Sequence, residues 1–146
     1  MITIESVWRP DEKIFLTQLG GLIDVETLRR WKALLRQTFQ KIGPNERFKF
    51  ISDLCGYQPA SQEVHREMRE VVPVVLASYG FRSVLLDIYE GIEVKLGNIR
   101  GINCYAAAHV HHDREKMDEF DERFGLPAER FFSDLDTARE WARMVG

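Results

Sequence analysis

The spacing of apolar residues changes from segment to segment along this chain, and this change limits the possible folds more than any other feature. Residues 2–8 and 14–19 are rich in β-branched residues and alternate in polarity, which predicts two strands. A turn-forming stretch at 9–12 separates them, and Gly20-Gly21 follows the second. The chain is therefore expected to open with a β-hairpin.

Two long segments that follow have helical spacing. Asp24 is placed to cap the first helix, and Gly43-Pro44 is expected to end it. Ser61 is expected to open the second helix, which Gly80 ends. Pro73 lies inside this second helix and should kink or split it, because proline lacks a backbone donor. The first helix carries a regular apolar stripe: Leu28, Trp31, Leu35, Phe39 and Ile42.

The rest of the chain alternates between short strands and helices. One helix is expected after Asp113, and a last one after a capping-box pattern formed by Ser133 and Asp136. Short apolar runs between turn-forming residues predict the remaining strands at 47–54, 84–89, 102–110 and 130–132. The predicted order, β-β-α-β-α-β-β-α-β-α, indicates an α/β fold with helices packed on a mixed β-sheet.

Length and composition fit a single domain over residues 1–146. The chain has no internal repeat, linker or low-complexity stretch, and 45% of its residues are hydrophobic, which supports a folded core. It carries 20 Lys and Arg against 23 Asp and Glu, a net charge of −3. This balance argues against a nucleic-acid partner, because a duplex-binding face needs clustered basic charge.

Cysteine usage and hydropathy bear on the compartment. Cys55 and Cys104 are far apart and form neither a CxxC pair nor a disulfide framework, which predicts reduced thiols and a cytoplasmic protein. The first residues lack the pattern of a signal peptide, and no apolar run approaches the roughly 20 residues of a membrane helix. No integral membrane segment is therefore expected.

Three segments, taken with the element order, resemble the SpoIIAA-like STAS family (STAS/Sec14-like domains). FKFISDL at 48–54 is similar to the central strand of that family. INCYAAAHVHHD at 102–113 is similar to its small-residue strand that leads into an Asp-capped helix. RFFSDLDTAREWA at 130–142 resembles its closing strand and helix.

The resemblance implies an α/β sandwich with helices mainly on one face of the sheet. It also implies a non-enzymatic module that acts through protein contacts or binds small apolar ligands, and it makes a homodimer plausible. Anti-sigma-factor antagonists of the family carry a phosphorylatable Asp-Ser-Ser-Gly after the central strand. In this chain only Ser61 falls near that position, without those neighbours, so Ser61 is a candidate regulatory residue.

The segment 109–113 holds the sharpest cluster of chemically active side chains. On a strand, His109, His111 and Asp113 would point to one face, because side chains alternate. Two imidazoles and a carboxylate are ligands that a divalent metal accepts. A divalent metal is the one cofactor that the sequence suggests. The commoner interpretation is that Asp113 caps a helix and that the histidines are solvated at the rim of the sheet.

A second candidate site is the loop after the strand at 47–54. Asp53 and Cys55 lie there, and ligands of open α/β sheets gather at the carboxyl ends of strands. A nucleophilic cysteine would need a neighbouring base, which sequence spacing does not supply, so a partly buried thiol is the commoner interpretation of Cys55. Asp53 could work with Asp87 in acid–base chemistry, but each could equally bond loop amides.

Three functions follow, in order of preference. The first is a regulatory or scaffolding module that binds a protein partner or itself. The second is a carrier of a small apolar or lipid-like ligand held between the helices and the sheet, for which the apolar run around Pro73 is the supporting feature. The third is a small metal-dependent enzyme that uses the histidine cluster. The sequence favours a protein that is not an enzyme.

Overall fold

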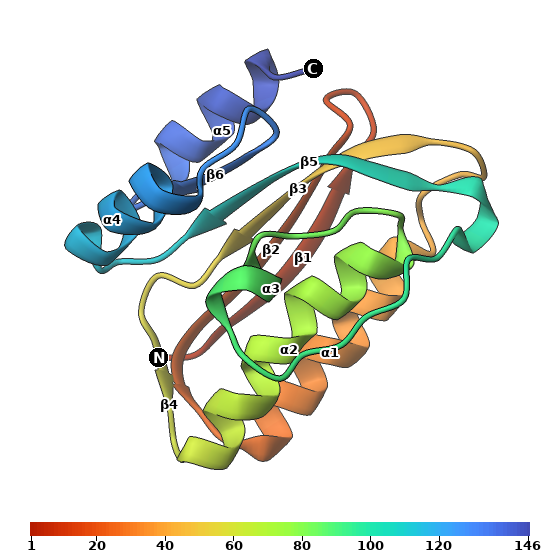
Figure 1. Ribbon diagram of the computed structural model, residues 1–146. Helices are drawn as coiled ribbons and strands as arrows, with labels where there is room; N and C mark the ends of the chain where they lie inside the picture. Colours follow the sequence, from red (N-terminus) through yellow and green to blue (C-terminus); the bar gives the residue numbers. More distant parts are fainter.

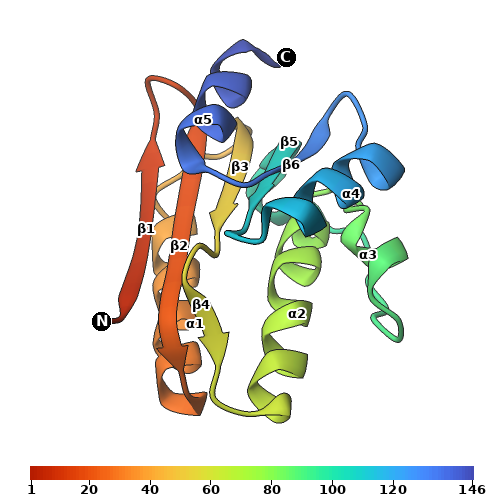
Figure 2. The same ribbon diagram turned by 90° about the vertical axis from the view of Figure 1, so that its left-hand side faces the viewer.

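The computed structural model describes residues 1–146 and contains a mixed six-stranded β-sheet. Strands follow the order β1-β2-β3-β5-β6, and β4 pairs with the end of β2 (Figure 2). β1 is antiparallel to β2, and all other pairs are parallel. The strands are β1 (Thr3–Arg9), β2 (Ile14–Ile23), β3 (Arg47–Asp53), β4 (Tyr57–Pro59), β5 (Asn103–Val110) and β6 (Glu129–Phe132). The predicted α/β class and mixed sheet are confirmed.

Helices cover both faces of this sheet (Figure 1). α1 and α2 lie side by side on one face, and α5 packs on the opposite face. α4 packs beside β6 at the sheet edge. The helices are α1 (Val25–Phe39), α2 (Gln62–Ser78), α3 (Leu85–Ile88), α4 (Arg114–Phe124) and α5 (Leu135–Met144), with a 3₁₀ turn at Ile99–Gly101.

The larger core lies between the sheet and the α1–α2 layer. Asp24 caps α1 as predicted, because its carboxylate accepts a hydrogen bond from the Thr27 amide at 2.8 Å. The predicted stripe of α1 is buried, and the Trp31 indole donates to the Thr17 hydroxyl at 2.7 Å. The Phe39 ring stacks on Phe15 with centroids 3.9 Å apart. The apolar periodicity of the sequence therefore places α1 correctly on the sheet.

A smaller core lies under α5. The buried residues Ala138 and Ala142 pack there against Ala108 of β5 and against aliphatic side chains of β2 and β3. Small side chains on both surfaces let the helix approach the sheet closely. Lys49 is buried on this face, and its ammonium donates to the Ala142 carbonyl at 2.6 Å, near the C-terminus of α5 where a cation is favourable.

Several predicted boundaries are wrong. Residues 84–89 are not a strand but contain α3, and their backbone donors point to Glu129 and to local carbonyls instead of a neighbouring strand. Asp134, rather than Ser133, caps α5, since it accepts from the Thr137 amide at 2.9 Å. α2 runs unbroken from Gln62 to Ser78, so Pro73 does not split it.

β2 extends beyond the predicted end at Gly20-Gly21. Gly20 lets the loop after β3 approach closely, because a Cβ there would lie 2.8 Å from the Cys55 carbonyl oxygen. Gly21 has φ +98° and lies against the backbone of Met1, where a Cβ has no room. From Gly21 onward β2 pairs with β4 instead of β3, and β4 is a three-residue strand that the sequence did not predict. None of the helices is long and apolar enough to span a bilayer.

Candidate functional site

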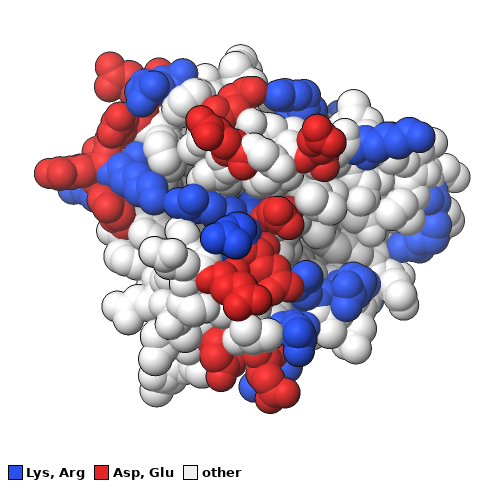
Figure 3. All heavy atoms as spheres, turned by 60° about the horizontal axis from the view of Figure 1, so that its bottom comes forward, with Lys and Arg blue, Asp and Glu red and all other residues white.

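A groove of about 600 Å³ lies between α1 and α2, on the side of these helices that Figure 3 brings into view. Both helices contribute apolar side chains to it, and Ile99 of the 3₁₀ turn adds another. Val74 and Ile99 are 44% and 46% exposed, which is high for aliphatic side chains. The complete apolar lining consists of Leu35, Phe39, Val71, Val74, Val75, Tyr79 and Ile99. A volume and lining of this kind are typical of sites for small ligands.

Charged side chains surround this apolar lining. At one end Lys32 of α1 and Glu67 of α2 form an ion pair of 3.3 Å. Toward the C-terminus of α1 the groove is lined by Arg36, which forms no ion pair, and by Arg100, which donates to the Phe39 carbonyl at 3.0 Å. Figure 3 shows basic and acidic side chains interspersed on this face. Glu70 of α2 lines the groove as well, so its rim carries two cations without an ion pair, Arg36 and Arg100, and one unpaired carboxylate around an apolar centre.

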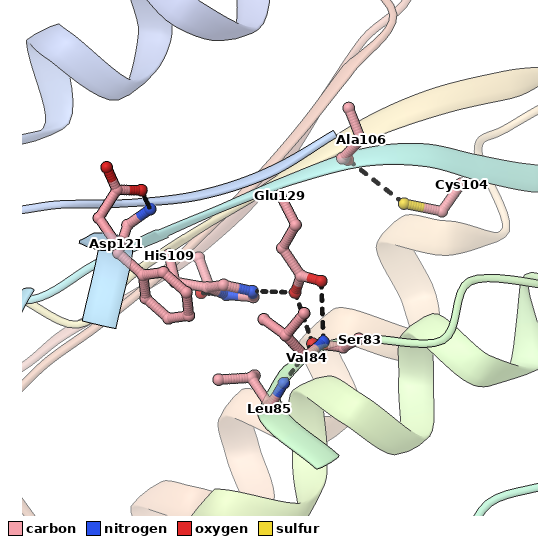
Figure 4. Close-up of polar contacts among 10 residues, drawn as sticks. Ser83, Val84, Leu85, Cys104, Ala106, His109, Asp121 and Glu129 are labelled. Carbon is pink, nitrogen blue, oxygen red and sulfur yellow. Dashed lines mark hydrogen bonds and ion pairs between the residues drawn. The ribbon is translucent and has the colours of Figure 1, made fainter. Parts of the chain in front are cut away.

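A second polar site is buried between β5, β6 and the start of α3 (Figure 4). Glu129, 1% exposed, lies with one carboxylate oxygen 2.6 Å from Nε2 of His109. That same oxygen accepts from the Ser83 hydroxyl at 2.5 Å, and the other accepts from the Val84 amide at 2.8 Å. Glu129 thus connects the sheet to the segment that precedes α3.

His109 also lines a small, partly open pocket. Ser52 Oγ lies 3.4 Å from His109 Nδ1, so His109 contacts Ser52 through one ring nitrogen and Glu129 through the other. These residue types occur in nucleophilic triads. The cavity beside them has a volume of only about 40 Å³ and an otherwise mostly apolar lining. It has room for about one water molecule, not for a substrate, so the contacts support a structural role.

The predicted metal ligands do not converge. The strand ends at Val110, so the expected alternation does not extend to His111 and Asp113. His109 points inward to Glu129, whereas His111 Nδ1 accepts from the Asp113 amide at 3.0 Å. Asp113 caps α4 by accepting from the Lys116 amide at 3.2 Å. No three His, Cys, Asp or Glu side chains are placed to hold a metal ion.

His111 and His112 lie against each other with ring centroids 4.2 Å apart. Burial, together with the neighbouring charges of His112 and Lys116, lowers the pKa of His111 to about 4. His112 Nδ1 accepts from the Gly56 amide at 3.0 Å, which ties this histidine pair to the loop after β3. These histidines therefore hold loop backbone in place.

The second candidate site also consists of residues that hold the local backbone. Asp53 accepts from the Gln18 side chain at 2.9 Å and from the Cys55 amide at 3.0 Å. Burial, followed by the neighbouring Asp53, raises the pKa of Cys55 to about 12, which keeps the thiol protonated and unreactive. Asp87 lies on α3 and pairs with Arg82 at 3.0 Å, so it does not join Asp53.

Ser61 is the N-cap of α2, as predicted. Its side chain is exposed and accepts from the Val64 amide at 3.2 Å. The structure thus explains the serine by helix capping, and a regulatory modification of Ser61 stays a prediction.

The sequence analysis named His109 of the buried cluster but missed Glu129 and Ser83, and it did not predict the groove. Glu129 had one signal: it precedes Phe131 by two positions, and alternation along a strand places both side chains on the inward face. Ser83 and Arg100 had none, because their roles depend on contacts between segments far apart in the sequence. No family model, no curated protein and no solved structure matches the chain.

Proposed function

We propose that this protein is a binding module for a small amphipathic molecule, and that the groove between α1 and α2 holds it. The ligand has an apolar chain and one anionic head group, as a medium-chain fatty acid does. The observation that carries this proposal is an exposed apolar groove of about 600 Å³ with Arg36 and Arg100 at one end.

The apolar lining supports the chain-binding half of the proposal. Val71, Val74 and Val75 line the groove from successive turns of α2, and Leu35 lines it from α1. Removing apolar surface from water contributes about 25 cal/mol for each Å² buried. A chain of eight to twelve carbons therefore gains several kcal/mol from burial in such a groove.

Arg36 and Arg100 support the head-group half of the proposal. Arg100 is held in place by its bond to the Phe39 carbonyl, and Arg36 is free to pair with an incoming anion. Guanidinium groups bind carboxylates through two parallel hydrogen bonds. Lys32 is less suited to this role because Glu67 already occupies it.

The residues of the groove favour binding over turnover. Its lining includes neither histidine nor cysteine, and its one serine, Ser78, donates to the Val74 carbonyl. We rank this function ahead of the alternatives because the groove and its arginines support it. A regulatory role through protein contacts, the homodimer and a metal-dependent activity stay predictions that follow from the sequence.

Fluorescence titration with 11-(dansylamino)undecanoic acid tests the proposal. We expect saturable binding with one site per chain and a blue shift of the probe emission. Val74→Glu places a carboxylate in the groove and should weaken binding at least about tenfold, since it buries a repulsive charge against the ligand. Val7→Glu is the matched control, because Val7 is similarly exposed, at 38%, but lies on β1.

Equal effects of the two substitutions would contradict the proposal, as would a probe that binds without saturation. A fluorescence increase of equal size with dansylamide, which lacks the chain, would also contradict it. Circular dichroism of both variants establishes that they remain folded.

A further inference from the structure

A second hollow, of about 510 Å³, lies beside the first turns of α2, away from the apolar lining of the groove. Its lining has no hydrophobic residue and no carboxylate, and three of its side chains are basic. The lining consists of Pro59, Ser61, Gln62, His65, Arg66 and Arg69. The hollow therefore presents basic groups without an acidic partner within it.

The two arginines of this hollow have no internal counter-charge. Neither Arg66 nor Arg69 takes part in any of the ion pairs of the molecule. The Arg69 guanidinium lies over the Tyr89 ring, 5.0 Å from its centroid, which limits its freedom. Arg66 is exposed on the same helix. Two unpaired guanidinium groups on one concave surface are suited to an anion with several acceptor oxygens.

His65 is oriented so that it can add a third donor. Its Nδ1 lies 3.2 Å from the Tyr57 hydroxyl, and the two rings stack with centroids 5.9 Å apart. Burial raises the pKa of Tyr57 to about 12, so the phenol keeps its proton. Nδ1 of His65 is the one hydrogen-bond partner of that hydroxyl. When the phenol donates to Nδ1, the proton of the neutral imidazole resides on Nε2.

Further positive charge reaches this region from α4. Burial lowers the pKa of His65, and the charges of Arg69 and of Lys116 on α4 lower it further. His111 lies close enough for its pKa to respond to His65 and Lys116 as well. Asp113, the acid whose charge acts on His111, accepts a hydrogen bond as the cap of α4. A bound anion would relieve this repulsion between like charges.

We propose that this hollow binds the phosphate group of a small, water-soluble phosphate ester, with Arg66, Arg69 and Nε2 of His65 as donors. No hydrophobic residue lines the hollow, which favours a soluble ester over a lipid with long apolar chains. The site is independent of the groove between α1 and α2, because the two share no lining residue.

NMR titration of the histidine ring resonances tests this site, with glycerol 3-phosphate and inorganic sulfate as ligands and chloride to hold the ionic strength constant. We expect saturable shifts at His65 and a rise of its pKa by about 0.5 or more in saturating sulfate, because an adjacent anion favours the charged imidazolium. Sulfate is used for the pKa measurement because it does not itself titrate in this range.

Variants separate a built site from general attraction of anions. Arg66→Glu changes an exposed side chain and should weaken binding about fivefold or more. Arg9→Glu is the matched control, since Arg9 is also exposed and unpaired but lies at the opposite end of the sheet. Arg69→Ala should weaken binding as well, and the Arg66 variant keeps the test valid if loss of the Tyr89 contact disturbs folding.

Vesicles distinguish the source of the phosphate. The protein should not sediment with phosphatidylcholine vesicles that contain 20% phosphatidic acid more than with pure phosphatidylcholine. Three results would overturn the proposal: chloride shifts His65 as much as sulfate does, Arg9→Glu weakens binding as much as Arg66→Glu, or binding occurs only on acidic vesicles.

Discussion

Glu129 and His109 form a buried pair in which the carboxylate lies 2.6 Å from the imidazole Nε2. The carboxylate also accepts from Ser83 and Val84, so three donors from two parts of the chain meet at one side chain. This arrangement fixes the segment before α3 to β6. A side chain with such contacts is costly to remove, because each donor is left without a partner in the interior.

We expect Glu129→Ala to lower the free energy of unfolding by about 3 kcal/mol, in the range found when one member of a buried pair is lost. Urea denaturation monitored by circular dichroism measures this. Glu140→Ala on α5 is the control, because Glu140 is exposed and forms no ion pair. A loss below about 0.5 kcal/mol for Glu129→Ala would show that the pair does not hold α3.

The contact between α4 and β6 offers a second prediction. Asp121 accepts from Arg130 at 2.7 and 2.8 Å and from the Phe131 amide at 3.0 Å. Asp121→Ala should lower the free energy of unfolding by about 1–3 kcal/mol, since charge-assisted bonds are lost and a backbone donor loses its partner.

Asp118 provides the matched control on the same helix. Its contact with Arg114 is 3.9 Å long, and both side chains are exposed. Asp118→Ala should change the free energy of unfolding by about 0.5 kcal/mol or less. Similar values for the two variants in thermal or urea unfolding would contradict the role given to Asp121.

The lowered pKa of His111 leads us to expect that the stability of the protein depends on pH. Its pKa is about 4 in the folded protein and about 6.5 when exposed, so between these values the unfolded chain binds more protons. Stability should therefore be fully present above about pH 6.5 and should fall as the pH is lowered toward 4. Burial of the neutral imidazole is the main cause, and the lowered pKa of His65 acts in the same direction.

Urea unfolding at several pH values between 4 and 7 measures how the free energy of unfolding changes with pH. His111→Gln, which cannot take up a proton, should flatten the curve in that window. A variant with the same slope as the unchanged protein would show that His111 is not responsible.

We expect the Cys55 thiol to react slowly with alkylating reagents. Its raised pKa, about 12, leaves little thiolate at pH 8, so alkylation by iodoacetamide should be about tenfold or more slower than for an unstructured cysteine peptide. Burial also raises the pKa of Cys104, which is 6% exposed and should react more slowly still. Mass spectrometry of tryptic peptides gives both rates. Rapid modification of Cys55 in the folded protein would contradict this prediction and would support a role of Cys55 as a nucleophile.

The sequence predicted most of the fold because most elements carry strong local signals. The period of α1, the caps Asp24, Ser61 and Asp113, and the apolar runs of β3 and β5 were enough to place these elements. β4 was missed because three residues carry no periodicity, and it forms only because β2 continues past Gly21. The run at 84–89 looked like a strand because a short apolar run does not distinguish a strand from a buried helix.

The candidate site could be predicted less well. The groove depends on the distance between α1 and α2, and the apolar spacing within each helix does not predict that distance. Arg100 reaches it from a 3₁₀ turn that is distant in sequence, and its own φ of +50° has no local signal. The spacing of His109, His111 and Asp113 predicted a shared face on one strand. The strand ends at Val110, one residue before His111, so these side chains do not lie on one face.

The most direct test of the central claim is an isotope-filtered NOE experiment on the methyl-labelled protein with unlabelled dodecanoate. Binding in the groove predicts NOEs from the chain of dodecanoate to the methyl groups of Val71, Val74 and Val75, and none to the methyl groups of Val7 or Leu22. Saturation by dodecanoate with NOEs confined to other methyl groups, or no binding at all, would contradict the claim that α1 and α2 form a ligand site.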